Sequence, residues 1–490
     1  MMTKVRTRFA PSPTGYMHIG NLRTALYAWL FARKSKGTFI LRIEDTDRNR
    51  LVEEAGDVIF RTMKDTGLYY DEGPDVGGAF GPYVQSERKS IYKEYAEKLV
   101  ELGAAYYCFC TKERLDEARA EAAAKGSVYK YDKHCLSLSK EEVARRIAAG
   151  EAYVIRQNIP ATGESSYDDM VYGHISVPMA DMEDNVLLKA DGWPTYNLAN
   201  VIDDHLMEIT HVIRGIEYLS STPKYNLLYD ALGWERPVYV HMPPVMKDKQ
   251  NKLSKRHGDA SYEDLIEKGY LKEAIINYIA LLGWSPGGEQ EIFTLEELIE
   301  AFSLEGLNKS PSIFDTEKLT WMNGEYIRAL SPEVFLEKAM PYFKEVFGEK
   351  EVDFARIASL IQPRLTVLTE IPGKVAFFAE MPAYDIDLYT HKKMKTTPEA
   401  SLPILEAAQT VLSVIAPFTN DEIYAGLTGL AEGLEVKSGQ VLWPVRIAIT
   451  GMGVTPGGAT EIAEILGKEE TLRRLGISIA YLQEQLKKEE

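Results

Sequence analysis

The chain has 490 residues, 45 % of them hydrophobic, which is enough for about three domains with buried cores. Its formal net charge of −17 excludes a strongly basic nucleic-acid-binding protein, although an acidic chain can still carry one basic face. Ordinary amounts of glycine and proline argue against a fibrous or disordered chain.

Three features of the sequence predict the cellular compartment of the protein. The chain has three cysteines, which is no disulfide framework and indicates a reducing environment. Residues 1–8 contain three basic residues and no apolar run, unlike a signal peptide. The longest weakly charged apolar stretch, near Ala274–Trp284, is too short to cross a bilayer. We therefore expect a soluble cytoplasmic protein without a membrane partner.

The first pattern, over residues 4–44, predicts a strand, a loop, a helix and a second strand. Residues 5–10 alternate and end at Pro11, as a strand does. Apolar residues then recur at helical spacing from Leu22 to Leu30, and TFILRI (38–43) predicts the second strand. Such a βαβ unit with glycine in its first turn predicts a parallel sheet that binds a nucleotide at its carboxyl edge.

The loop PSPTGYMHIGN (11–21) opens directly into the predicted helix. A helix N-terminus offers unpaired N–H groups and the positive end of a dipole, which suit a phosphate. Gly20 allows a flat base or ribose to approach the backbone, and His18 can donate to a phosphate oxygen as charge develops. The loop therefore predicts a nucleotide-phosphate site.

All three cysteines fall in one short segment. Cys108 and Cys110 precede a charged helix predicted at roughly 111–125, and Cys135 follows it. A C-x-C pair with a third cysteine some 25 residues later suits tetrahedral Zn²⁺ in a structural role. Either Tyr131 or His134 can supply the fourth ligand, and the alternative is three thiols without a metal.

The remaining chain divides into three regions. Residues 150–190 are rich in predicted strands, and from Pro194 the α/β pattern resumes, with strands at 211–215 and 237–243. A nucleotide-binding sheet split by an insertion explains this order. Helical periods dominate after about residue 325, so a separate all-helical domain is expected beyond a boundary near 325–331.

A second loop, Lys252-Leu253-Ser254-Lys255-Arg256, follows the last of these strands. Three cations within five residues can neutralise a triphosphate. Lys255 is the candidate for the strongest phosphate contact, with Lys252 in support.

Both loops resemble the signatures of one enzyme family. His18-Ile19-Gly20-Asn21 is similar to the HIGH motif of class I aminoacyl-tRNA synthetases, with Asn21 in place of histidine, and KLSKR is similar to KMSKS, ending in Arg256. The flanking TRFAPSPTGYMHIGN, which includes Pro11, and ILRIEDTD resemble the glutamyl branch. Residues 439–446 and 466–469 resemble bacterial anticodon-binding domains, so the likeness spans essentially the whole chain, most specifically its first half.

This resemblance implies a glutamate–tRNA ligase that uses ATP with Mg²⁺ and transfers L-glutamate to the 3′ end of tRNA(Glu). It implies catalytic roles for His18, Gly20, Lys252 and Lys255. It implies glutamate contacts from Arg8, Ala10, Ser12, Glu44, Tyr196, Asn200 and Arg214. It implies ATP contacts from His18, Gly20, Asn21, Glu217, Lys252, Ser254 and Lys255. Zinc ligands would be Cys108, Cys110, Tyr131 and Cys135.

Specificity for glutamate follows from the charge of this predicted pocket. Arg214 would pair with the γ-carboxylate and Glu44 with the α-amino group. A site built around an arginine pair should reject glutamine, because the neutral amide leaves a cation unpaired.

The expected domains follow from the same likeness: a Rossmann-like α/β catalytic domain (1–107 and 191–258), an inserted acceptor-end-binding domain (108–190), a stem-contact or connecting domain (259–330), and a helical anticodon-binding domain (331–490). Gln362 and Arg364 lie near the expected anticodon surface, but no residue is assigned to reading the anticodon. A monomer is expected.

Four alternatives stay open on the sequence alone. The closest is a non-discriminating enzyme that also charges tRNA(Gln), since the two forms differ in the anticodon domain. A short paralogue that glutamylates a modified tRNA base would lack residues 331–490. A non-catalytic tRNA-binding paralogue would lose one of the two signature loops. A small-metabolite nucleotidyltransferase would not need the long helical tail.

Overall fold

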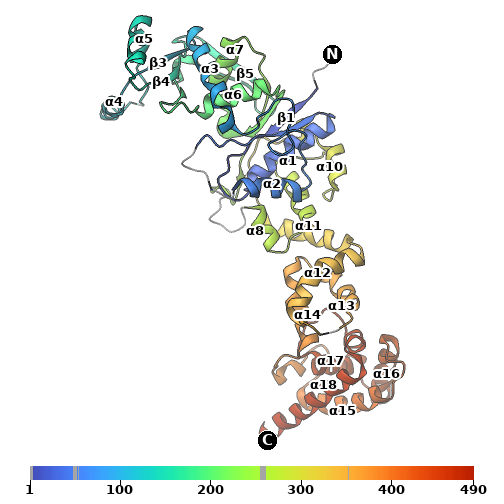
Figure 1. The fold of residues 1–490 in the computed structure, drawn as a ribbon. Coiled ribbons are helices and arrows are strands. Elements are labelled where there is room, and N and C mark those ends of the chain that lie inside the picture. The colour runs from blue at the N-terminus through green and yellow to red at the C-terminus, as the bar shows by residue number, and fades with distance from the viewer. Residues whose placement is uncertain are drawn as a thin grey trace. The chain divides into compact units, whose positions relative to one another are not determined.

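The computed structural model describes residues 4–47, 52, 55–127, 129–253, 261–350 and 352–489, which form two compact units. The N-terminal unit comprises the chain up to residue 267 together with residues 272–316. The C-terminal unit comprises residues 268–271 and the chain from residue 317 onward. In Figure 1 the labelled strands belong to the first unit, and the labelled elements from α12 onward are all helices.

A βαβ unit begins the N-terminal unit. Strand β1 (Arg6–Phe9) pairs in parallel with β2 (Thr38–Leu41), and helix α1 (Ile19–Lys34) connects them. The apolar face of α1 is buried, as its spacing predicts. The chain turns back at Gly37, where a side chain would collide with the carbonyl oxygen of Val5. The βαβ unit expected from the sequence is confirmed.

A four-stranded sheet, ordered β6-β5-β9-β8, continues this layer. Strands β8 and β9 are parallel, β5 and β6 form an antiparallel hairpin, and β5 meets β9 through the single parallel pair Asp169–Tyr239. The backbone N–H of Thr210 donates to the carbonyl of Arg6 (3.0 Å), which holds the start of β8 beside β1. The strands are β5 (Glu164–Asp169), β6 (Gly173–Pro178), β8 (His211–Gly215) and β9 (Val238–Met242).

The predicted insertion carries its own small antiparallel sheet, ordered β3-β4-β7. Helix α4 follows β3 and buries none of its side chains, which agrees with its charged sequence. The elements are β3 (Ala105–Cys108), α4 (Lys112–Ala124), α5 (Lys140–Ala148), β4 (Val154–Gln157) and β7 (Val186–Leu188).

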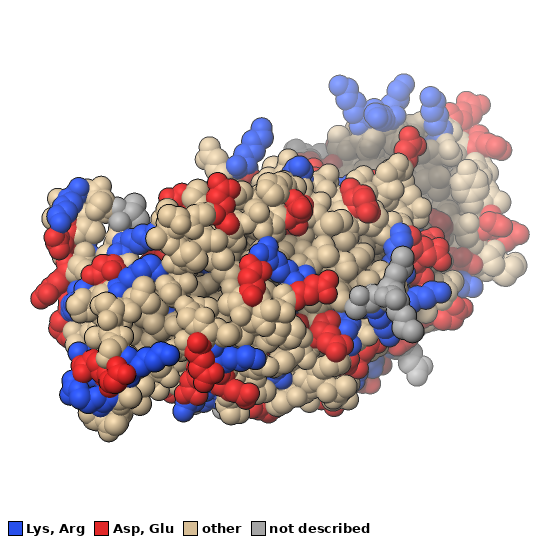
Figure 2. Space-filling view, turned by 90° about the horizontal axis from the view of Figure 1, so that it is seen from above, with Lys and Arg blue, Asp and Glu red and all other residues tan. Residues whose placement is uncertain are grey.

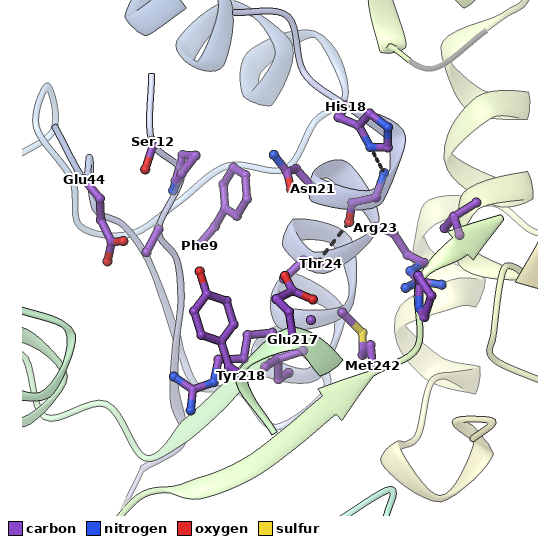
Figure 3. A pocket seen from close by; sticks show the side chains of 18 of the residues that line it. Phe9, Ser12, His18, Asn21, Arg23, Thr24, Glu44, Glu217, Tyr218 and Met242 are labelled. Carbon is purple, nitrogen blue, oxygen red and sulfur yellow. Dashed lines mark hydrogen bonds between the residues drawn. The ribbon is translucent and has the colours of Figure 1, made fainter. Parts of the chain in front are cut away.

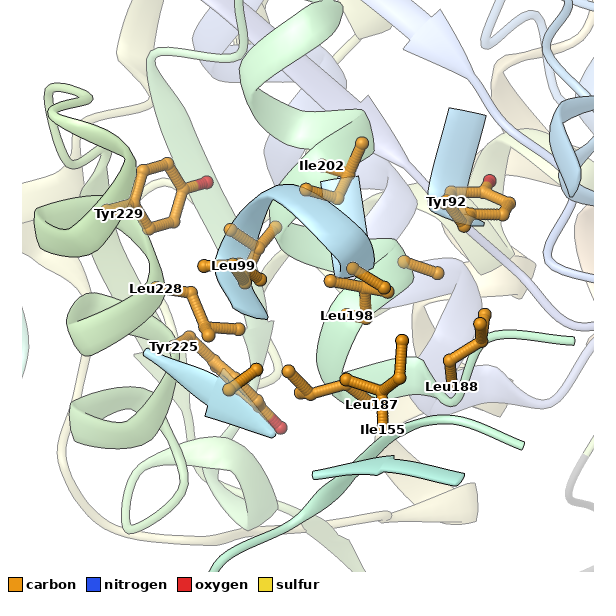
Figure 4. Packing of buried hydrophobic residues seen from close by; sticks show 14 residues of the cluster. Tyr92, Leu99, Ile155, Leu187, Leu188, Leu198, Ile202, Tyr225, Leu228 and Tyr229 are labelled. Carbon is orange, nitrogen blue, oxygen red and sulfur yellow. The ribbon is translucent and has the colours of Figure 1, made fainter. Parts of the chain in front are cut away.

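One apolar core joins the insertion to the helices that flank the main sheet (Figure 4). Helix α3 (Lys89–Glu101) contributes Leu99, α6 (Tyr196–Leu206) contributes Leu198, and α7 (Thr222–Leu232) contributes Leu228. These side chains pack against Ile155 of β4 and against Leu187 and Leu188 of β7. Because a single core contains both groups of elements, the insertion is fixed against α3, α6 and α7.

Shorter elements complete the N-terminal unit. Helices α9 and α10 lie far from α1 in the sequence and pack against it in the fold. A two-residue parallel pairing joins β10 to β11. The elements are α2 (Ala55–Asp65), β10 (Val245–Met246), α8 (Tyr262–Glu267), α9 (Lys272–Ala280), α10 (Leu295–Ala301) and β11 (Ser312–Ile313).

The C-terminal unit is helical over its described residues, as the periodicity of the sequence predicts. Its longest helix, α18, changes direction at Gly467, where φ is 78°. The helices are α11 (Thr316–Ala329), α12 (Pro332–Phe347), α13 (Phe354–Ile361), α14 (Ile371–Ala379), α15 (Pro398–Val414), α16 (Asn420–Gly433), α17 (Ser438–Thr450) and α18 (Ala459–Glu489).

The shared core gives the first prediction. Leu198 is fully buried in it, so Leu198→Ala should lower the free energy of unfolding by about 2–5 kcal/mol through lost burial and a residual cavity. Leu102, at the end of α3, is 53 % exposed, and Leu102→Ala should change the free energy by less than about 0.5 kcal/mol. Urea unfolding measures both, and equal effects of the two substitutions would contradict the assignment of this core.

Candidate active site

A cavity of about 380 Å³ lies at the carboxyl ends of β1, β2, β8 and β9. Figure 3 shows Glu44 and Tyr218 on one side of it, His18 and Arg23 on the other, and Glu217 between them. The sequence predicts this edge of the sheet as the ligand site. The lining residues are Arg8, Phe9, Ala10, Pro11, Ser12, Thr14, His18, Gly20, Asn21, Arg23, Thr24, Glu44, Tyr196, Ile213, Arg214, Gly215, Glu217, Tyr218, Met242, Pro243, Pro244, Val245, Lys252 and Leu253.

The N-terminus of α1 opens into this cavity. His18 caps the helix, because its Nδ1 accepts a hydrogen bond from the backbone N–H of Gly20 (3.0 Å). Its Nε2 lies 3.2 Å from the carbonyl oxygen of Leu253. With Nδ1 accepting, a neutral ring carries its proton on Nε2 and donates it to that carbonyl. The capped helix end therefore presents both its dipole and a fixed imidazole to a ligand.

The chain on both sides of the second signature loop is bound to the His18 segment. Leu253 contacts His18 as described, and Ser261 forms an antiparallel bridge with His18. The backbone N–H of Tyr262 donates to the carbonyl of Met17 (3.0 Å), and Glu263 accepts from the N–H of Met17 (3.2 Å). The two loops are therefore joined at their bases.

Lys252 lines the cavity at the start of this loop. The other predicted phosphate contacts, Ser254 and Lys255, and the motif residue Arg256 lie outside the described residues.

Buried charges surround Asp204 of α6, below the cavity. Its carboxylate pairs with Arg8 of β1 (3.1 and 3.2 Å) and with Arg42, just after β2 (2.7 Å). Burial alone would raise the pKa of Asp204, but these two guanidinium groups hold it below its ordinary value. Arg42 also donates to Glu44 (3.0 Å). For Glu44 burial prevails over Arg42, so its pKa lies above the ordinary value.

The neighbouring Asp203 extends this network, 3.8 Å from Arg42. It accepts from Arg88 (2.7 Å), Gln85 (2.9 Å) and Tyr92 (2.8 Å). Each buried carboxylate on α6 therefore has cationic and polar partners, which is the condition for burying an ion at tolerable cost.

Arg214 is placed differently. It is 5 % exposed, yet among the described residues no carboxylate lies within 4.0 Å of its guanidinium nitrogens. The rings of Tyr218, Tyr225 and Tyr239 surround its Cζ at 5.0, 5.2 and 5.5 Å. Tyr196 stacks on Tyr218 with a centroid distance of 4.9 Å. A buried cation that lines a cavity and has no carboxylate partner of its own can pair with an anionic ligand.

Most predicted site residues line this one cavity, and Asn200 does not. The backbone carbonyl of Tyr196 accepts from the side chain of Asn200, which lies buried one helical turn further along α6. Tyr218 and Arg23 line the cavity but were not singled out from the sequence. Arg23 interrupts the apolar face of α1, a signal that could have identified it, whereas nothing in the segment after β8 marks Tyr218.

The three cysteines form a compact cluster. Their sulfur atoms lie within 4.8 Å of one another, with 3.6 Å between those of Cys110 and Cys135. The Oη of Tyr131 is 3.2 Å from the Cys108 sulfur and 3.3 Å from that of Cys110. Sulfur ligands at about 2.3 Å from Zn²⁺ lie roughly 3.8 Å apart, so these atoms fit a tetrahedral site. His134 is exposed on a short 3₁₀ turn, whereas the hydroxyl of Tyr131 lies beside the sulfur atoms.

Two arginines contact the cluster from outside. Arg156 donates from Nε to the Cys108 sulfur (3.4 Å), and its Cζ lies 4.2 Å from the ring centroid of Tyr131. Arg114 donates to the sulfur of Cys110 (3.5 Å). The pKa of the Cys108 thiol lies below its ordinary value because Cys135, Tyr131 and Arg156 donate to its sulfur, against the effect of burial. These donors favour the thiolate of Cys108, the form that ligates a metal, whereas the hydrogen bond to Cys108 and burial raise the pKa of Cys135.

Comparisons with known proteins agree with this geometry. Residues 4–321 match the family model of class I tRNA synthetases (E and Q), catalytic domain, and residues 334–479 match an anticodon-binding domain. A glutamate–tRNA ligase of Clostridium botulinum is 60 % identical over 98 % of this chain and 99 % of its own, and one of Clostridium tetani is 58 % identical over 99 % of each.

A solved structure has the same fold. The glutamate tRNA ligase of Elizabethkingia meningosepticum, crystallised with its amino acid, superposes with a TM-score of 0.91 at 36 % identity. The match covers 98 % of this chain and 100 % of that one.

The charge network gives the second prediction. Asp204→Asn leaves Arg8 and Arg42 buried with too little negative charge, so the free energy of unfolding at neutral pH should fall by about 3–5 kcal/mol. Asp230→Asn, which breaks the exposed pair with Arg236, should cost no more than about 1 kcal/mol.

The pH dependence of this loss has a definite sign. Because folding depresses the pKa of Asp204, its stabilising effect is complete above the ordinary carboxyl pKa of about 4 and disappears as the pH falls through the folded value. The difference between Asp204→Asn and the wild type should therefore shrink in acid. Urea unfolding across pH measures it, and a constant difference would show that Asp204 is not held as an ion.

Proposed function

The chain belongs to the class I tRNA synthetases of the glutamate and glutamine family, and we propose that it is a glutamate–tRNA ligase, which activates L-glutamate with ATP and transfers it to the 3′ end of tRNA(Glu). The relatives that share 58–60 % identity over nearly the whole chain support this assignment. The short paralogue that glutamylates a modified tRNA base is excluded, because the match to an anticodon-binding domain covers the helical C-terminal region, which that paralogue lacks.

One observation carries the choice of amino acid: Arg214 is a buried cation that lines the cavity and lacks a carboxylate among its described neighbours. The γ-carboxylate of glutamate would complete that pairing, ideally with two hydrogen bonds. Glutamine would place a neutral amide there and leave the cation unpaired. A site that forms hydrogen bonds with its substrate in this way can discriminate by a factor of about 10⁴.

The opposite end of the amino acid would meet Glu44. Its carboxylate lies in the same cavity. One carboxylate oxygen accepts a hydrogen bond from Arg42 (3.0 Å), so the charge of Glu44 is only partly neutralised. The α-ammonium group of glutamate would complete this pairing. We propose that Arg8, Ala10, Ser12 and Tyr196 shape the space between the two charged ends, and that Asn200 holds the backbone turn of Tyr196.

ATP would occupy the other side of the cavity, where the N-terminus of α1 lies. We propose that His18, Gly20 and Asn21 contact its phosphates and sugar, with Glu217 and Lys252 beside them. We propose phosphate contacts also for Ser254 and Lys255, which lie outside the described residues, in the segment between Leu253 and Ser261. Mg²⁺ is proposed as the partner of the ATP phosphates, without assigned protein ligands.

The chemistry then depends on position and charge. The α-carboxylate oxygen of glutamate attacks the α-phosphorus of ATP, the bond to pyrophosphate breaks, and glutamyl-adenylate forms. The terminal adenosine of the tRNA then attacks the activated carbonyl through a hydroxyl, the 2′ one by class I behaviour, and AMP leaves. The helix dipole, His18 and the lysines stabilise the negative charge that develops on the phosphate oxygens. No protein nucleophile is needed.

The cysteine cluster would hold a structural Zn²⁺. We propose Cys108, Cys110, Tyr131 and Cys135 as its ligands, because these four side chains converge at tetrahedral spacing. When bound, the ion would cross-link β3 to the segment after α4 and so stiffen the insertion.

Acceptor and anticodon recognition are assigned by region. We propose that the insertion (108–190) meets the acceptor end, that 259–330 contacts the stem, and that 331–490 binds the anticodon, around a catalytic domain formed by 1–107 and 191–258. The net charge of the chain is −17, and basic side chains are interspersed with acidic ones over the face shown in Figure 2, so contacts with tRNA phosphates would come from individual Lys and Arg side chains. Use of tRNA(Gln), a monomeric state and a cytoplasmic location stay predictions. No described helix is long and apolar enough to cross a membrane.

The test of the function is pyrophosphate exchange in the presence of tRNA(Glu), with glutamate and glutamine compared. The wild type should exchange with glutamate and not with glutamine. Arg214→Gln should reduce kcat/KM for glutamate by about 10³-fold or more, because the γ-carboxylate loses its cation. Arg236→Gln, at an exposed pair, is the matched control and should change little. Absence of exchange with glutamate in the wild type would refute the proposed function, and charging of purified tRNA(Gln) separates the two forms of the enzyme.

The zinc proposal has its own measurement. The purified wild type should contain about one zinc ion per chain by elemental analysis. Cys135→Ser should lose the metal and Tyr131→Phe should lower its occupancy. His134→Ala should keep it, because that side chain points to solvent. Retention of zinc in Tyr131→Phe together with its loss in His134→Ala would reverse the assignment of the fourth ligand.

A further inference from the structure

Two buried side chains outside the cavity lining form a hydrogen-bonded chain behind Arg214. The Nε of Arg214 donates to Nε2 of His241 (3.1 Å), and Nδ1 of His241 lies 2.6 Å from Oδ2 of Asp169. The side chains of His241 and Asp169 are fully buried. We infer that Asp169 and His241 are positioning residues that hold Arg214 in the orientation selective for glutamate, an inference that rests on the proposed function.

The contacts of Arg214 show which edge of the guanidinium is fixed. Its Nε is bound by His241 and its Nη2 donates to Oγ1 of Thr222 (2.6 Å). The hydroxyl of Thr222 in turn donates to the carbonyl of Tyr218 (2.7 Å). Only Nη1 faces a weak partner, the hydroxyl of Tyr196 at 3.5 Å. Anchoring one edge of a planar fork leaves the other edge aimed at the ligand.

Asp169 determines which nitrogen of His241 can accept from Arg214. A carboxylate at Nδ1 keeps the proton on that nitrogen, so Nε2 presents its lone pair to Arg214. Oδ2 of Asp169 also accepts from the backbone N–H of His241 (3.1 Å). Its other oxygen, Oδ1, accepts from the N–H groups of Val171 and Tyr172 (3.0 and 2.9 Å). Four donors therefore hold this carboxylate in place.

Burial and the neighbouring cation agree with a neutral imidazole. The pKa of His241 lies below its ordinary value, mainly because of burial and further because of Arg214, although Asp169 opposes both. A protonated ring would have no lone pair at Nε2 and would repel Arg214.

The sheet itself sets the spacing of the three side chains. Arg214 and His241 are directly paired residues of the parallel strands β8 and β9. Asp169 ends β5, where that strand joins β9 through its pairing with Tyr239. Three adjacent strands thus supply the three members, and none depends on a flexible loop. Since neither His241 nor Asp169 lines the cavity, their effect on the substrate passes through Arg214.

The experiment compares KM for glutamate with KM for ATP in pyrophosphate exchange with tRNA(Glu). His241→Phe removes the acceptor while keeping a planar ring, and KM for glutamate should rise about 10- to 100-fold, the scale of a small misplacement of a binding group. KM for ATP should stay within about twofold, since ATP does not depend on Arg214. Exchange with glutamine, relative to glutamate, should increase.

His241→Gln is the rescue variant, because its amide can accept from Arg214 and donate to Asp169. It should recover most of the affinity for glutamate. His211→Phe is the matched control, a histidine substitution at the other end of β8 that leaves the cavity untouched. If His241→Phe does not fold, His241→Asn replaces it, since the shorter amide cannot reach both partners and should raise KM for glutamate alone.

The outcomes distinguish the positioning role from the proposed function. An unchanged KM for glutamate in His241→Phe or His241→Asn, or an equal rise in KM for ATP, would overturn the positioning role. That role would also be contradicted if His241→Gln raised KM for glutamate as much as His241→Phe. Failure of the wild type to exchange with glutamate would instead overturn the proposed function. The positioning role of His241 and Asp169 would then be overturned with it.

Discussion

The buried ion pairs around Asp204 fix the geometry on which the cavity depends. Arg8 comes from β1, Arg42 from just after β2 and Asp204 from α6, which is 196 residues from Arg8 and 162 from Arg42 in the chain. Removing such groups from water is costly, and only close pairing offsets that cost. The strands and the helix therefore have little freedom to shift, because any shift would separate charges that cannot reach water. The same arrangement positions Glu44 in the cavity, because Arg42 also donates a hydrogen bond to Glu44.

Arg214 differs from Arg8 and Arg42 because it has no carboxylate partner among the described residues, and the proposed selectivity for glutamate rests on this difference. Arg8 and Arg42 are neutralised within the protein, whereas Arg214 has tyrosine rings and neutral hydrogen-bond partners around it. The sequence suggested that an arginine pair rejects glutamine. The structure divides the pair: Arg8 is already bound to Asp204, whereas no carboxylate of the described residues lies within 4.0 Å of the guanidinium nitrogens of Arg214. An acidic ligand would supply the missing charge, and a neutral amide would not.

Sequence reasoning placed candidate residues correctly where they lie at the ends of regular elements. The loop before α1, Glu44 after β2 and Arg214 near the end of β8 could all be placed, because parallel strands bring their carboxyl ends to one edge. It could not find His241 or Asp169. Their importance comes from pairing across β5, β9 and β8, and strand order is not visible in the chain. Tyr218 was missed for a related reason, since its ring matters only once Tyr196 and Arg214 are brought beside it.

A cation that must stay unpaired until the ligand arrives needs support from groups that do not cancel its charge. A carboxylate beside Arg214 would hold it firmly but would also occupy the partner that glutamate has to provide. A neutral imidazole and a threonine hydroxyl hold the same guanidinium without neutralising it. Asp169 contacts His241 and orients its ring, and the ring separates this carboxylate from Arg214. In the proposed enzyme, the carboxylate of Asp169 thus fixes the orientation of His241, and the positive charge of Arg214 would remain for the substrate.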